Sequence, residues 1–246
     1  MQLKDNDLSY IVRHIPSDLR DMMQKNGGDT GIKIGGGFIR AIIAGEKISD
    51  IDIFGSSKDQ LKVIASECAF NRGCKVHESA NAITLLSPPR WPVQFITRWS
   101  FDSPESCMSS FDFTIAQAVI WYEPIISDED RKERRPHWRS FCHPDFYSDL
   151  AAHRLVYTYP QRDEDAGGSI MRTRKFLSRG YNIQPASFAG VIARLCVGVE
   201  QVKKSVPDEQ FLAKILQALL VEVDPLVIVD GQELIFDHQG ANDKEL

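Results

Sequence analysis

The strongest constraint on the fold lies in residues 33–55, KIGGGFIRAIIAGEKISDIDIFG. A strand-like run is followed by Gly35, Gly36 and Gly37, and then by apolar residues at helical spacing. Where a strand turns through glycines into a helix, backbone N–H groups lie at the positive end of the helix dipole and no Cβ atom hinders a phosphate. The pattern predicts a phosphate-binding turn at Gly36 and Gly37, to which Arg40 adds a guanidinium in the first helical turn.

Two aspartates follow in the run DIDIF. Because side chains alternate along a strand, Asp50 and Asp52 share one face while Ile51 and Ile53 face the core. Two carboxylates with no base between them repel each other unless a cation lies there, and hard oxygen ligands suit Mg²⁺. The pair predicts a Mg²⁺ site, which together with the glycine turn is typical of phosphoryl or nucleotidyl transfer.

Each motif has an ordinary alternative. An Asp-x-Asp pair also occurs on solvent-facing strand edges, and a glycine run also makes tight turns. Their combination favours a site. The sequence contains no GxxxxGK[ST] motif, and GGGFIRA is not GxGxxG in a long parallel-sheet context, so P-loop and Rossmann folds are disfavoured.

The periodicity of the chain predicts an α/β (α+β) fold with a small mixed sheet and a helical domain after it. Strand-like and helix-like runs alternate from about residue 16 to 122, and SPPRWP reads as a hairpin turn. Helical spacing dominates from about residue 145. We expect a head domain at 1–125, a linker or active-site flap at 126–144, and a helical domain with an acidic tail at 145–246. The strand-like runs are 32–34, 50–54, 75–78, 82–86 and 93–97; the helix-like runs are 37–45, 58–70, 144–159, 167–180, 185–202 and 207–223.

Composition narrows the class of protein. The net charge of −5 argues against a protein that coats nucleic acid, although residues 222–246, with seven acids and one base, account for the excess of negative charge. The N-terminus lacks the pattern of a secretory leader and no apolar run approaches the length of a membrane span, so we expect a cytoplasmic protein with no membrane partner. Five scattered cysteines fit free thiols in a reducing compartment. The spacing of Cys68, Cys74 and His77 is not that of a zinc site.

These motifs resemble a known family. The stretch GGFIRAIIAGEKISDIDI (36–53) is similar to the signature of the polymerase-β nucleotidyltransferase superfamily, most closely to the head domain of tRNA nucleotidyltransferases (CCA-adding enzymes) and related poly(A) polymerases. Three later stretches resemble further landmarks of that family in the same order: VQFITR (93–98), FDFTIAQAVIWYE (111–123) and IMRTRKFLSRGYNI (170–183).

The resemblance implies transfer of a nucleoside monophosphate from an NTP to an acceptor hydroxyl, with an RNA (tRNA-like) 3′ end as the expected acceptor. It implies that Asp50 and Asp52 are catalytic ligands of Mg²⁺. It places Gly36, Gly37 and Arg40 near the triphosphate.

Asp112, in FDFT, is expected on the nucleotide side or in a structural role, and a metal-binding role stays open as the alternative. In the run 171–179, Arg172, Lys175 and Arg179 share one helical face, while Met171, Phe176 and Leu177 are expected on the other side. The position of this helix in the family implies that Arg172 and Lys175 contact nucleotide and that Arg179 contacts RNA. The alternative is an ordinary solvated helix face.

The chain departs from the family pattern at Ala41, Glu46, Gln94 and the pair Ser110-Phe111. Gln94 occupies a strand position where many superfamily members carry a third carboxylate. Three classes of function follow: nucleotidyl transfer to RNA, nucleotidyl transfer to a protein hydroxyl as in toxin or antitoxin members of the superfamily, and an inactive nucleotide- or partner-binding module.

Overall fold

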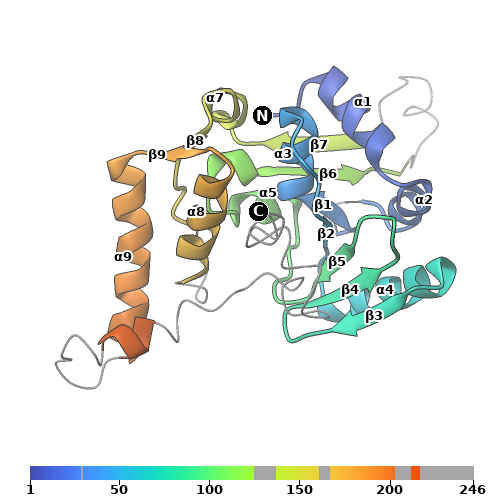
Figure 1. The fold of residues 1–246 in the computed structure, drawn as a ribbon. Helices are drawn as coiled ribbons and strands as arrows, with labels where there is room; N and C mark the ends of the chain where they lie inside the picture. The colour runs from blue at the N-terminus through green and yellow to red at the C-terminus, as the bar shows by residue number, and fades with distance from the viewer. Residues whose placement is uncertain (29, 125–136, 161–166, 203–211, 217–246) are drawn as a thin grey trace. The chain divides into compact units, whose positions relative to one another are not determined.

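The computed structural model describes residues 1–28, 30–124, 137–160, 167–202 and 212–216 (Figure 1). The chain divides into two compact units. The first unit contains Met1–Phe111 and Ile115–Phe146. The second contains Asp112–Thr114 and the chain from Tyr147 onward. The acidic tail at 222–246 lies outside the described residues.

The first unit is built on one mixed seven-stranded sheet with the order β3-β4-β5-β2-β1-β6-β7 (Figure 1). Strands β2 and β5 pair in parallel and the other neighbours are antiparallel. This sheet confirms the predicted fold class. The strands are β1 (Lys33–Gly35), β2 (Ile51–Phe54), β3 (Lys75–Glu78), β4 (Ala82–Leu86), β5 (Val93–Ile96), β6 (Ala118–Tyr122) and β7 (Trp138–Cys142).

Helices complete the first unit. Helix α3 contacts β1 and β2, α4 contacts β4 and β5, and α5 contacts β6 and β7. Ser57 caps α4 by accepting from the backbone N–H of Gln60, and Ser103 and Ser106 form a reciprocal capping box at α5. The helices are α1 (Asp5–His14), α2 (Ser17–Lys25), α3 (Gly37–Ala44), α4 (Lys58–Arg72) and α5 (Pro104–Ser109), with a 3₁₀ turn η1 at Thr114–Ala116.

The core of the first unit follows from strand alternation. Ile51 and Ile53 of β2 are fully buried, as predicted, so Asp52 and Phe54 point to the opposite face of the sheet. On that face Phe54 belongs to an apolar cluster with Phe101, Cys107, Val119 and Trp121. On its own face of the sheet, Asp52 is therefore followed along β2 by this apolar cluster.

The predicted hairpin around SPPRWP is confirmed. Strands β4 and β5 flank it and pair antiparallel, with Leu85 opposite Val93. The strand-like and helix-like runs predicted between residues 32 and 97 all form elements of the expected type. Helices α1 and α2 were not predicted.

The predicted linker or flap at 126–144 differs from the structure in part. Residues 138–142 form β7, which pairs with β6 along its length. Pairing with β6 supplies the backbone hydrogen bonds that make Trp138–Cys142 a strand, and this pairing is not encoded within the segment itself. Residues 125–136 lie outside the described residues.

The second unit contains α7 (Phe146–Ala151), α8 (Gly168–Ser178), α9 (Pro185–Val202) and a parallel two-stranded sheet of β8 (Arg154–Leu155) and β9 (Asn182–Ile183). The prediction of one helix over 144–159 is wrong beyond α7. His153 adopts a left-handed φ of 48°, which ends the helix, and the chain then continues as β8. Of the helical run predicted at 207–223, residues 212–216 are described and are helical.

Among the helices of the described part of the chain, none combines the length and apolar character needed to cross a membrane.

Candidate functional site

The glycine turn joins β1 to α3, as predicted. Gly36 has φ 71° and ψ −125°, a conformation that residues with a Cβ rarely adopt, and its N–H donates to the carbonyl of Ala118 at 3.0 Å. At Gly35 a Cβ would lie 2.9 Å from Cζ of Phe111 and 3.2 Å from Cγ1 of Val119. The positive φ therefore explains the glycine at position 36, and close packing explains the glycine at position 35.

Among the described residues, nothing similar explains Gly37. A Cβ built there meets none of their atoms within 4 Å, and the φ of Gly37 lies outside the left-handed region. Gly37 is the first residue of α3, and no side chain caps that helix start. First-turn N–H groups have no partner inside a helix. The open space above Gly37 is therefore suited to an anion that approaches the backbone.

We expect Gly37→Val to lower NTP affinity about tenfold, which corresponds to about 1.4 kcal/mol, because its side chain occupies the space that a phosphate would use. The fold should persist, since a Cβ at this position meets no atom of the described residues within 4 Å. Isothermal titration with each NTP and thermal unfolding measure the two effects. Gly36→Ala is the contrasting variant and should destabilise the protein because of its positive φ. Undiminished NTP affinity in Gly37→Val would show that no phosphate approaches there.

The two aspartates lie at the start of β2. Asp50 immediately precedes the strand and Asp52 is its second residue. Strand β2 pairs with β1 so that Ile34 lies opposite Ile53, and the next step of this register brings Gly35 opposite Asp52. The aspartates and the glycine turn are therefore neighbours in one sheet.

Hydrogen bonds orient Asp50 on both of its carboxylate oxygens. Ser49 Oγ donates to Oδ1 at 2.6 Å, and Gln94 Nε2 donates to Oδ2 at 2.9 Å. Sequence reasoning placed Gln94 at the third-carboxylate position but missed this contact, which joins residues on different strands.

Arg40, predicted near the triphosphate, is buried in α3. Its Nε lies 3.1 Å from Oε2 of Glu46, and its side chain is 4% exposed. Glu46 follows the helix in the loop that leads to Asp50. In this structure Arg40 therefore makes an ion pair within the connection between the glycine turn and the aspartates, and a contact to a triphosphate stays a prediction.

Asp112 lies in the second unit and is held by α8. Its Oδ2 accepts hydrogen bonds from Ser169 Oγ at 2.9 Å and from Arg172 Nε at 2.6 Å. The side chain of Asp112 is 1% exposed and that of Arg172 is 27% exposed. The two residues predicted at the nucleotide are thus partners of each other, which favours the structural role for Asp112.

A model of the Gabija anti-defense 2 family matches residues 9–153, which is more than half of the chain. The chain belongs to the Gabija anti-defense 2 family. No curated protein matches it significantly.

Solved structures show the fold of this Gabija anti-defense 2 family member. A Thermotoga maritima CCA-adding enzyme complexed with tRNA is 17% identical, with a TM-score of 0.52 over 92% of this chain and 52% of that one. A CCA-adding enzyme with ATP is 17% identical, with a TM-score of 0.53 over 89% and 51%. A tRNA-processing enzyme is 15% identical, with a TM-score of 0.51 over 89% and 58%. The polymerase-β nucleotidyltransferase fold is confirmed, and the chain spans about half the length of these proteins.

Asp50 and Asp52 would suit a magnesium ion whose remaining ligands come from a nucleotide and water. Across the described part of this family member, no group of three or more His, Cys, Asp or Glu side chains could hold a metal. Asp50 and Asp52 supply two carboxylates on one side of the sheet. Mg²⁺ is commonly bound by one or two carboxylates together with substrate phosphates and water, so two acids suffice.

Helix α8 carries the remaining predicted residues. Lys175 is half-buried on the helix and Arg179 is its C-cap residue. Phe176 is buried, as expected, but Leu177 is 45% exposed. Thr173 and Phe176 are buried residues of α8, and the side of the helix expected for Leu177 stays a prediction.

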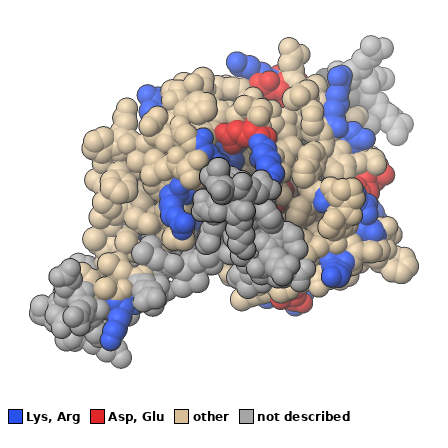
Figure 2. All heavy atoms as spheres, viewed as in Figure 1, with Lys and Arg blue, Asp and Glu red and all other residues tan. Residues whose placement is uncertain are grey.

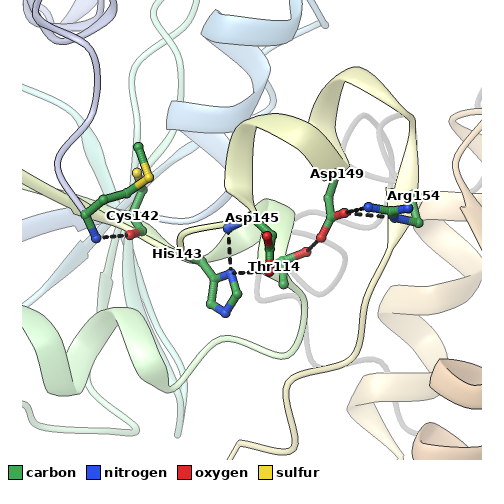
Figure 3. A network of polar contacts seen from close by, with 7 residues as sticks. Thr114, Cys142, His143, Asp145, Asp149 and Arg154 are labelled. Carbon is green, nitrogen blue, oxygen red and sulfur yellow. Dashed lines mark hydrogen bonds and ion pairs between the residues drawn. The ribbon is translucent and has the colours of Figure 1, made fainter.

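A second polar network in the second unit was missed by sequence reasoning (Figure 3). Asp149 of α7 points toward Thr114 and Arg154, accepting from Thr114 Oγ1 at 2.6 Å and from Arg154 Nε at 2.8 Å. The Asp149 side chain is 1% exposed. The network ties the short 112–114 segment to α7 and β8, so it supports the same segment that carries Asp112.

Proposed function

We propose that this chain is a Mg²⁺-dependent nucleotidyltransferase that moves a nucleoside monophosphate from an NTP to an acceptor hydroxyl and releases pyrophosphate. The observation that carries the proposal is the adjacency of Asp52 to the glycine turn in the β1–β2 register, with Gly37 open to an anion. Asp50 and Asp52 would hold the metal, and α3 would receive the phosphates at its N-terminus. Magnesium held there would stabilise the negative charge that develops on the α-phosphate during nucleotidyl transfer.

Other residues of the first unit have supporting tasks in this proposal. Gly36 sets the turn that aims the α3 N–H groups, and Ser49 orients the Asp50 carboxylate. The Arg40–Glu46 ion pair holds the loop that leads to Asp50. The head and helical domains expected from the sequence remain our proposal for the organisation of the chain.

The test is incubation with each α-³²P-labelled NTP and Mg²⁺, separately with total RNA and with total protein. We expect label to be transferred to one of the two fractions and to disappear with EDTA. Binding of NTP without transfer to either fraction would instead identify an inactive nucleotide-binding module.

An RNA 3′ end is the acceptor that we propose first, with Lys175 and Arg179 of α8 as contact residues and Arg172 in its ion pair with Asp112. We expect Lys175→Ala/Arg179→Ala to weaken RNA binding and to reduce the slope of log affinity against log salt by about 0.7 for each lost single-strand phosphate contact. Filter binding at several salt concentrations measures the slope. Lys58→Ala/Lys75→Ala removes the same charge from exposed positions of the first unit and serves as the control.

A protein hydroxyl is the second candidate acceptor. Arg172 forms an ion pair with Asp112, so the face of α8 expected to bind RNA carries less net positive charge. On the face in Figure 2, Lys and Arg side chains of the described residues form separate small groups with acids among them, and no continuous basic tract is visible. The name of the family sets its members against the Gabija defence. An unchanged salt slope with label in the protein fraction would establish this candidate.

A further inference from the structure

Gln94 lies beside both aspartates. It belongs to β5, the strand that pairs in parallel with β2, and its Cα partner there is Asp52. Its side-chain amide donates to Oδ2 of Asp50 at 2.9 Å, and the residue is 1% exposed. One buried glutamine therefore lies in register with one aspartate and hydrogen-bonds the other.

On its other side Gln94 pairs with Thr84 of β4. Cross-strand partners point to the same face, so Asp52, Gln94 and Thr84 form a polar row on the sheet. Thr84 is fully buried, and its Oγ1 has no hydrogen-bond partner in the described part of the chain. A carboxylate in place of Gln94 would add a third negative charge beside Asp50 and Asp52, whereas the amide adds a hydrogen-bond donor.

We propose that Gln94 is a positioning residue for Asp50, fixing the carboxylate for the metal and keeping the site at two negative charges. The inference rests on the proposed function. Each carboxylate oxygen can accept more than one bond, so the contact orients Asp50 without using up its capacity for a cation. Groups that hydrogen-bond a metal ligand typically contribute 10- to 100-fold in metal affinity or activity.

The experiment measures the affinity of the full chain for the Mn²⁺ complexes of the four α,β-methylene nucleoside triphosphates, by water-proton relaxation enhancement. Gln94→Leu removes the donor at similar volume, and Gln94→Glu replaces the donor by a charge. Thr84→Val is the matched control, because it alters the adjacent buried position in the same row without breaking a hydrogen bond. Thermal unfolding of every variant separates a loss of fold from a loss of affinity.

We expect Gln94→Leu and Gln94→Glu each to bind the Mn²⁺ complex about 10-fold or more weakly, with Thr84→Val equal to the wild-type protein. If Gln94→Leu bound the Mn²⁺ complexes as tightly as the wild-type protein, the positioning role would be wrong, while the proposed function would stand. Tighter binding in Gln94→Glu would overturn the positioning role too, because the position would then act as a metal-ligand position. Absence of binding by the wild-type protein to all four complexes would overturn the proposed function itself.

Discussion

Asp52→Asn should abolish nucleotidyl transfer while the protein stays folded. The substitution keeps the shape of the side chain but removes a charge from the proposed metal site, and metal catalysis contributes several kcal/mol to phosphoryl transfer. We expect a loss of about 10³-fold or more in rate, which corresponds to about 4 kcal/mol. Asp50→Asn should cause a similar loss in the rate of transfer. Incorporation of labelled nucleotide measures the rate, and circular dichroism checks the fold.

Asp102→Asn is the control, since Asp102 is exposed in the same unit. It removes the same charge and should retain activity. Equal activity in Asp52→Asn and the wild-type protein would eliminate the proposed metal-dependent mechanism and leave Asp52 without a role in catalysis.

Asp112→Asn should destabilise the second unit without changing the requirement for Mg²⁺. The substitution removes the charge that Arg172 faces, and hydrogen bonds to charged groups contribute about 1.5–3 kcal/mol. We expect a loss of about 2 kcal/mol in the free energy of unfolding, seen as faster amide hydrogen exchange in α8 and as a melting temperature lower by about 4–8 °C. The concentration of Mg²⁺ for half-maximal transfer should stay as in the wild-type protein.

A double-mutant cycle of Asp112→Asn and Arg172→Met measures the coupling energy between these two side chains. A coupling energy of about 1–3 kcal/mol would assign the loss to this contact. Arg174→Met, which removes an exposed arginine from the same helix, should have little effect. A large rise in the Mg²⁺ requirement of Asp112→Asn would instead make Asp112 a metal ligand, which is the alternative that the sequence left open.

Local patterns alone predicted the core of the candidate site. The run of glycines between apolar residues predicted the turn from β1 to α3, because the positive φ of Gly36 favours a residue without a Cβ. Strand alternation predicted that Ile51 and Ile53 are buried while Asp52 points to the other face. These features depend on residues within a few positions of one another, so they can be predicted from the sequence alone.

What depends on distant partners was decided only by the tertiary structure. Gln94 reaches Asp50 across 44 residues, and Arg172 reaches Asp112 across 60. Strand β7 exists because β6 supplies its hydrogen bonds, and the helix predicted over 144–159 ends early where His153 turns the chain into β8. The sequence by itself determined which groups could do chemistry, since composition and periodicity act locally. The structure decided which of them face one another, because side-chain pairing depends on strand order and helix packing that no local pattern encodes.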